Sequence, residues 1–102
     1  MKENKKLSQA QQQELFFILD RENRKLNEIF AKIKLVDDKF SQTFNLVKSY
    51  YEDMKHFFDK KEYVKAFELQ NYVWGMLDSL AVMKAIQVSK ETQKWFKADF
   101  VQ

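Results

Sequence analysis

The sequence has no cysteine, no proline and a single glycine among its 102 residues. Tight turns and bulges take their unusual backbone angles from Gly and Pro, so a β-sandwich, a barrel or a Rossmann unit is disfavoured. Without cysteine, a disulfide framework, a thiolate metal site and a thiol nucleophile are excluded. These absences favour an all-α fold, and the missing thiols fit a reducing compartment, so we expect a cytoplasmic protein.

Long hydrophobic runs and a strong charge imbalance are also missing. The most apolar window, Val73 to Ile86, contains Asp78 and Lys84 and is shorter than the roughly 20 residues that span a bilayer. The basic start Met1–Lys6 is followed by polar residues instead of the apolar core of an export signal. We therefore expect no export signal and no membrane segment. A net charge of +3, with 32% charged and 45% hydrophobic residues, favours a single globular domain over residues 1–102.

Apolar residues at alternating spacings of three and four predict three helices, over about residues 8–34, 38–60 and 63–87. Ser8 followed by Gln11 is typical of a capping box at the start of the first helix. The polar cluster Lys60-Lys61-Glu62 predicts the end of the second. The third helix has the widest apolar arc, so we expect it to be the most buried. Residues from about 90 to 98 predict a short helix or tail that its aromatic residues dock onto the bundle.

Aromatic residues occur in four adjacent pairs, namely Phe16-Phe17, Tyr50-Tyr51, Phe57-Phe58 and Trp95-Phe96. Neighbours on a helix point about 100° apart, so one pair cannot face a single partner helix. Each helix of a bundle touches two others, which explains the pairs within one chain. Alternatively, the outer member of some pairs belongs to an interface with a second copy or another protein, where aromatic residues are enriched.

The segment 49–78 resembles the archaeal family catalogued as domain of unknown function 357. The resemblance is carried by Tyr51, Asp53, Phe57 or Phe58, Tyr63-Val64, Ala66-Phe67, Asn71-Tyr72, Trp74-Gly75 and Leu77-Asp78. It implies a left-handed, up-down-up three-helix bundle with no established activity. The sequence departs from the family where Lys61-Glu62 replaces the expected Gly-Asp in the turn, and a non-glycine residue in a left-handed cap costs about 1 kcal/mol.

No complete catalytic or metal-binding set is found, so we expect neither an enzyme nor a cofactor. A hairpin centred near Lys61 would place Asp53 and Asp78 roughly 14 Å apart along the bundle, too far to share a proton or a metal. Each is expected to accept hydrogen bonds at a helix seam. His56 has no second carboxylate and histidine motif to complete a di-metal site, and we expect it to be partly exposed.

The lone glycine, Gly75, lies within a predicted helix, where glycine costs about 1 kcal/mol relative to alanine. One interpretation is a close approach of the helices, with Gly75 opposite Val47. The other is a small groove for a ligand or a partner side chain, lined by Asn71, Trp74, Gly75 and Asp78.

Basic residues along most of the chain alternate with acidic ones, as on an ordinary solvated helix. The C-terminal segment differs, because Lys90, Lys94 and Lys97 lie beside the aromatic Trp95 and together offer phosphate contacts and a stacking platform. The favoured hypothesis is a non-catalytic protein-interaction module, either a homodimer or a binder of another protein. The alternative is RNA binding through the C-terminal segment.

Overall fold

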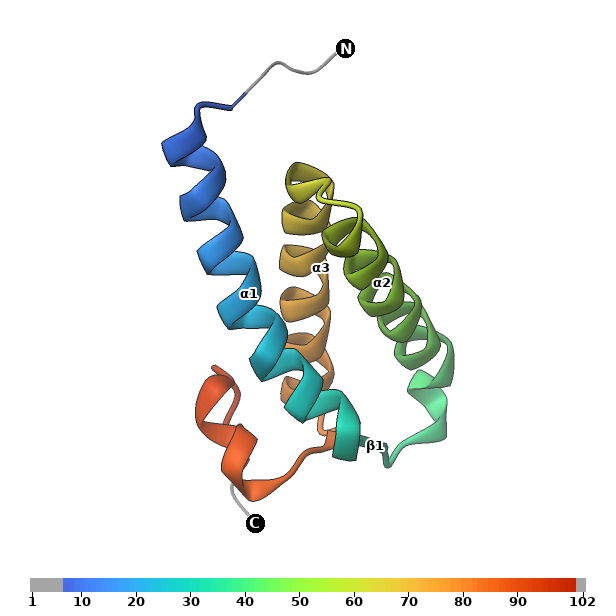
Figure 1. Cartoon of the computed structure of the whole chain (residues 1–102). Coiled ribbons are helices and arrows are strands. Elements are labelled where there is room, and N and C mark those ends of the chain that lie inside the picture. The colour runs from blue at the N-terminus through green and yellow to red at the C-terminus, as the bar shows by residue number, and fades with distance from the viewer. Residues whose placement is uncertain (1–6, 101–102) are drawn as a thin grey trace.

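The computed structural model describes residues 7–100, so the basic start Met1–Lys6 lies outside the described part (Figure 1). The elements follow in the order α1 (Gln9–Lys32), β1 (Lys34–Leu35), the 3-10 helix η1 (Asp38–Phe40), α2 (Ser41–Asp59), α3 (Tyr63–Val82), β2 (Ile86–Gln87) and the 3-10 helix η2 (Lys90–Trp95). Three long helices dominate this part of the chain, which confirms the all-helical class. The left-handed, up-down-up arrangement stays a prediction.

The first helix begins with the capping box that the sequence predicts. The Ser8 hydroxyl oxygen accepts from the Gln11 amide at 3.1 Å, and the Gln11 side-chain oxygen accepts from the Ser8 amide at 2.9 Å. The helix ends at Lys32, two residues before the predicted boundary, because the backbone of Ile33 is extended and leads into β1. Asp37 caps η1 by accepting from the Lys39 amide at 3.1 Å, so the second helical segment starts as a 3-10 turn.

A short antiparallel clasp of β1 and β2 was not predicted from the sequence. Lys34 pairs with Gln87 and Leu35 with Ile86, and the Val36 amide donates to the Ala85 carbonyl at 2.8 Å. The prediction that the third helix continues to residue 87 is therefore wrong. Lys84 adopts a left-handed conformation with φ of 59°, which ends α3 and turns the chain toward β1.

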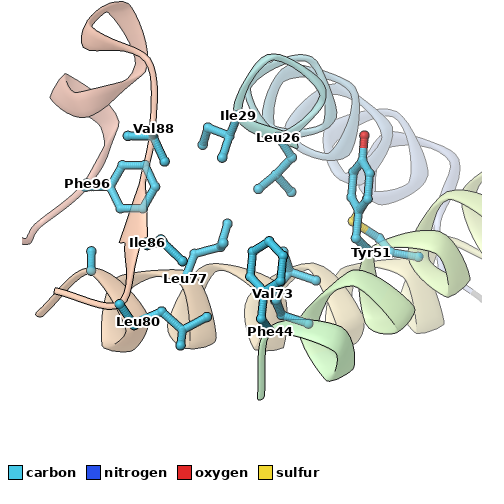
Figure 2. Close-up of a cluster of buried hydrophobic side chains, with 14 of the residues drawn as sticks. Leu26, Ile29, Phe44, Tyr51, Val73, Leu77, Leu80, Ile86, Val88 and Phe96 are labelled. Carbon is cyan, nitrogen blue, oxygen red and sulfur yellow. The ribbon is translucent and has the colours of Figure 1, made fainter. Parts of the chain in front are cut away.

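The core is shared by all three long helices and the C-terminal segment (Figure 2). α2 and α3 are joined by a short turn and pack along their length, and α1 packs mainly against α3 (Figure 1). Labelled core residues in Figure 2 are Leu26 and Ile29 of α1, Phe44 and Tyr51 of α2, Val73, Leu77 and Leu80 of α3, and Ile86, Val88 and Phe96. The residues from 88 to 100, here called the strap, thus close one side of the bundle.

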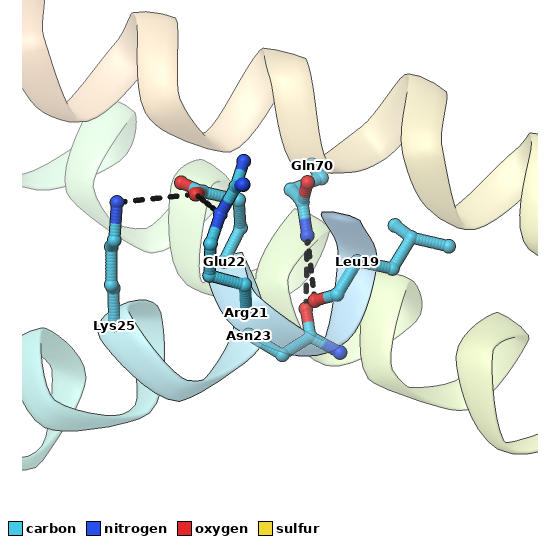
Figure 3. Close-up of polar contacts among 6 residues, drawn as sticks. All are labelled: Leu19, Arg21, Glu22, Asn23, Lys25 and Gln70. Atoms are coloured by element: carbon cyan, nitrogen blue, oxygen red, sulfur yellow. Dashed lines mark hydrogen bonds and ion pairs between the residues drawn. The ribbon is translucent and has the colours of Figure 1, made fainter. Parts of the chain in front are cut away.

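Three polar side chains are buried among the described residues, namely Asn23, Gln70 and Thr92. Gln70 on α3 is 2% exposed, and its amide nitrogen donates to the Leu19 carbonyl at 3.3 Å and to the Asn23 side-chain oxygen at 3.1 Å (Figure 3). A buried amide with its hydrogen bonds made costs little, whereas an unpaired one is expensive. The contact therefore favours one position of α1 along α3.

Most members of the adjacent aromatic pairs contact a second helix of the same chain. Phe16 stacks on Phe58 with ring centroids 5.5 Å apart, and Tyr51 stacks on Phe30 at 4.1 Å. Phe17 is the outward-facing member, at 63% exposed. The interpretation that each helix touches two others thus accounts for most of the pairs.

Candidate functional site

The four predicted groove residues have different neighbours around α3. Asn71 and Gly75, four residues apart, line a shallow hollow between the C-terminal half of α3 and the start of α2. Trp74 and Asp78, also four apart, lie on the side that the strap covers. The spacing i, i+3, i+4, i+7 places all four residues within an arc of about 100° on α3. The strap covers the part of this arc that carries Trp74 and Asp78 and leaves Asn71 and Gly75 exposed. The four residues do not form one groove.

Trp74 and Asp78 hold the strap. The Trp74 ring meets Phe96 edge to face with centroids 6.1 Å apart, and an Asp78 carboxylate oxygen accepts from the Lys97 amide at 3.0 Å. Asp78 therefore makes the hydrogen bond at a seam that the sequence led us to expect. Within residues 7–100, the Trp74 indole nitrogen is the one buried side-chain polar atom without a hydrogen-bond partner.

Gly75 is exposed, and a Cβ atom added to it would meet nothing within 4 Å. The predicted close approach to Val47 is therefore wrong. The angular position explains why, since Gly75 lies about 160° around the helix from the buried Val73. Nothing in the described part of this chain requires a glycine at position 75.

The side of the α2 and α3 pair that carries the hollow is here called the uncharged face. It consists of Phe40, Thr43 and Leu46 from α2 and its 3-10 turn, with Asn71, Tyr72, Gly75, Met76, Ser79, Val82 and Met83 from α3. Tyr72, Val82 and Met83 are 61%, 65% and 58% exposed. From Gln70 to Met83 the one charged residue is Asp78, which is turned toward the strap. The side chains of the face are thus apolar or neutral, with the Lys39 ammonium 5.7 Å from the centroid of the Phe40 ring.

Tyr72 is held in place at one end of the uncharged face. Its ring stacks on Tyr50 of α2 with centroids 5.8 Å apart and an interplanar angle of 26°. The stacking fixes an aromatic surface that still points largely to solvent. The hollow beside it is therefore bordered by an ordered side chain.

The predicted nucleic-acid contacts lie on and just after η2. Lys90, Lys94 and Lys97 are exposed, whereas Trp95 is partly buried against the core. The Trp95 ring has the Lys94 ammonium 5.6 Å and the Lys25 ammonium 6.0 Å from its centroid. One part of the ring thus faces α1, which reduces the surface available for stacking on a base.

Two further lysines come close to this segment through the clasp. Lys32 and Lys34 line a hollow together with Gln87 and Ser89, immediately before Lys90. Among the described residues, no carboxylate forms an ion pair with any of these lysines or with Lys94 and Lys97. The sequence alone gave no signal for this grouping, because it depends on the pairing of β1 with β2.

A different charge arrangement is found on the middle of α1. Glu22 accepts from the Arg21 guanidinium at 2.8 Å and lies 3.1 Å from the Lys25 ammonium (Figure 3). Partial burial acts to raise the pKa of Glu22, but these hydrogen bonds and the two positive charges outweigh it and hold the pKa below the ordinary value of 4.5. The basic residues of this region are thus neutralised locally.

The remaining titratable residues are dispersed. Asp53 and His56 are both exposed on α2, and the His56 ring meets only its neighbour Phe57, edge to face at 5.9 Å, among the ring contacts of the described residues. No group of three or more His, Asp or Glu residues within residues 7–100 is arranged to hold a metal ion. None of the described helices is long and apolar enough to cross a membrane.

Three long helices, a two-stranded clasp and a mainly apolar core define a small helical-bundle protein. A family model described as "Protein of unknown function (DUF357)" matches residues 19–86, well over half of the chain. The chain belongs to this family, as the resemblance predicted. Comparisons with curated proteins and with solved structures gave no match.

Proposed function

We propose that this protein is a non-catalytic interaction module that binds a protein partner through the uncharged face. The observation that carries the proposal is the exposure of Tyr72, Val82 and Met83 around a neutral hollow in a chain of which 32% is charged. Contiguous apolar surface on a small protein is typical of a binding surface, and the centre of an interface is poor in charge.

The proposal of a non-catalytic role is supported by the distribution of reactive groups. Asp78 is engaged by the backbone of the strap, and Asp53 is exposed on another helix. General acid and base catalysis needs two such groups within reach of one substrate. A cytoplasmic location is proposed from composition, because a chain without cysteine has no disulfide that requires an oxidising compartment.

Site-specific photo-cross-linking in living cells tests the uncharged face. A benzophenone amino acid replaces Tyr72 in one variant and Phe17 in the control, because these aromatic residues are 61% and 63% exposed on different helices. We expect a discrete cross-linked product from position 72 and none from position 17. No product from position 72, or the same products from both positions, would overturn the proposal.

RNA binding by the C-terminal segment is a second candidate. It is favoured by one observation, that Lys90, Lys94 and Lys97 are exposed and make no ion pair with the described carboxylates. Unpaired lysines on one segment are suited to phosphate contacts, which are sequence-independent and weaken steeply with salt.

A filter-binding titration with a single-stranded RNA tests this candidate at about 50 and about 200 mM salt. We expect the triple variant K90Q/K94Q/K97Q to lose most of the affinity and the salt dependence. The matched control is K48Q/K61Q, which removes two exposed lysines elsewhere that also make no ion pair with the described residues. Equal loss in the triple variant and the control would exclude a specific role of the segment.

A further inference from the structure

We propose that the partner on the uncharged face is a second copy of this chain, and that α3 of one copy packs against α3 of the other across a two-fold axis near Gly75. The proposal rests on the proposed function, because it uses the same face and names its occupant. It commits to a symmetric dimer, in which each copy offers the same surface to the other.

Gly75 is the first reason. Glycine within a helix costs about 1 kcal/mol relative to alanine, through the backbone freedom lost on folding. In this chain a Cβ at position 75 would meet nothing within 4 Å, so no contact within the described part of one copy offsets the cost. Two helices pack with their axes 8–10 Å apart, and the side chains at the crossing point set the distance. A glycine at that point allows the two helix axes to approach to about 8 Å.

The residues around Gly75 form a row on the exposed side of α3, here called the crest, against which a second helix could pack. Asn71, Gly75, Ser79 and Val82 follow spacings of four, four and three, so they lie in one row on the side of α3 away from the core. The row is small and uncharged at its centre. Exposed Tyr72 and Met83 flank the row on the side of the hollow, where they border the space that a second helix would fill.

Charge is the second reason. Across a two-fold axis each side chain meets its own equivalent or a close neighbour of it, so a charged crest would bring like charges together. Each copy carries a net charge of +3, which makes a charge-free contact surface more important. The row from Asn71 to Met83 has no charged side chain on this side, because Asp78 is turned to the strap. The central part of the face therefore brings no like charges together.

An antiparallel crossing centred on Gly75 also pairs the polar groups. Residues whose numbers sum to 150 then lie at the same level, which brings Asn71 of one copy opposite Ser79 of the partner subunit. An amide and a hydroxyl are both donor and acceptor, so this pair can hydrogen bond in the rim of the contact. The same rule brings the exposed Val82 to the level of Glu68 of the partner subunit, at the end of the contact.

Sedimentation equilibrium of the purified full chain, from about 1 to 100 µM, tests the dimer. We expect wild type to dimerise in this range and V82E to be monomeric, because the variant places a second carboxylate at the level of Glu68 of the partner subunit. The control is F17E, which alters an apolar residue of nearly equal exposure on α1, 63% against 65%, and should dimerise like wild type. Circular dichroism confirms that each variant is folded.

Gly75→Ala is a second, independent test, because it should stabilise the monomer and weaken the dimer. The midpoint of thermal unfolding of the monomer should rise, because alanine favours the helix and its Cβ meets open space. The dimer dissociation constant should rise about tenfold, because the two methyl groups separate the helices. A residue without an interface role would show the first effect alone.

Two results would overturn the proposal: a wild type that is monomeric throughout, or a dimer that V82E and Gly75→Ala leave unchanged. A monomer that still cross-links from position 72 to a different protein would overturn the dimer and leave the interaction module standing. A monomer without any such product would overturn both.

Discussion

Two lysines end the second and third long helices in the left-handed conformation. Lys61 has φ of 64° and Lys84 has φ of 59°. In both places the next amide reaches back five residues, from Glu62 to the Phe57 carbonyl and from Ala85 to the Leu80 carbonyl, each at 2.9 Å. This capping pattern normally has glycine at the left-handed position. The departure from the family at Lys61 pointed to this strain in the turn.

Lys61→Gly should therefore stabilise the protein. Glycine relieves the left-handed strain, but it also has more conformational freedom in the unfolded chain. The free energy of unfolding should therefore rise by about 0.5–1 kcal/mol. Urea unfolding followed by circular dichroism measures it. The neighbouring Lys60 has φ of −84°, so Lys60→Gly should destabilise, and two changes of the same sign would contradict the explanation.

Glu22 should contribute stability that depends on pH. Its carboxylate is 15% exposed and contacts Arg21 and Lys25, which hold its folded-state pKa below 4.5. A lowered folded-state pKa stabilises the fold above the unfolded-state value, and this stabilisation is lost as the pH falls through the folded-state pKa. E22Q should thus be less stable than wild type at pH 7, with a difference that shrinks toward about pH 3.

Urea unfolding at both pH values measures this difference, with E28Q as the control. Glu28 is exposed on the same helix and makes no ion pair with the described residues. A destabilisation of E22Q that is equally large at both pH values would assign the effect to packing instead of charge.

Helical spacing predicts which residues share a helix face, but not which other segment covers that face. Asn71, Trp74, Gly75 and Asp78 share one face by spacing, and the sequence did not show that the strap would cover Trp74 and Asp78. Gln70 was missed for a different reason. A polar residue on an apolar face is not recognisable as buried until the helix that supplies its hydrogen-bond partners, here α1 with Leu19 and Asn23, is in place.

Among the elements, the long helices were predictable and the clasp was not. Apolar spacing over five or more turns identifies α1, α2 and α3, and the capping box locates the start of α1. β1 and β2 are two residues each, which is too short for the alternation that marks a strand. Their pairing comes from the left-handed turn at Lys84, which directs the chain back to Leu35.

Phe96 is the most buried aromatic side chain of the strap. Phe96 is 8% exposed and contacts Trp74 and Phe100. Phe96→Ala should cost about 3 kcal/mol, because truncating a buried phenylalanine leaves a cavity. It should also release η2, which would shift tryptophan fluorescence toward that of exposed rings. The exposed Asp99→Ala is the control, and unchanged fluorescence in Phe96→Ala would show that the strap is held by other contacts.

For the molecule as a whole, the family match coincides with the buried part of the first three helices. It begins at Leu19, the first buried residue of α1, and ends at Ile86 in β2. Residues 9–18 include no buried residue, so this half of α1 is held mainly by side contacts such as Phe16 on Phe58. The matched region thus consists of the α2 and α3 pair with the inner half of α1 and the clasp.

Amide hydrogen exchange should reproduce this division. Amides of residues 13–18 should exchange well before those of residues 51–54 and 73–80, because local opening is easiest where few apolar contacts are broken. Two-dimensional NMR with deuterated solvent measures each rate. Uniform protection along α1 would contradict the division and would indicate that its outer half is covered in solution.

The β clasp has a topological consequence. By pairing Lys34 with Gln87 it closes the α2 and α3 hairpin into a loop. Hydrogen bonds close this loop, and a covalent bond at the same place could replace them. Paired residues of an antiparallel ladder have Cα atoms about 4.5–5.5 Å apart, within the range of a disulfide. Because the chain has no cysteine of its own, K34C/Q87C would carry a single pair of thiols with no competing partner. Oxidation would lock a loop of about fifty residues, worth about 4 kcal/mol of chain entropy, and turn the hairpin into a molecular ring from which α1 and the strap emerge side by side.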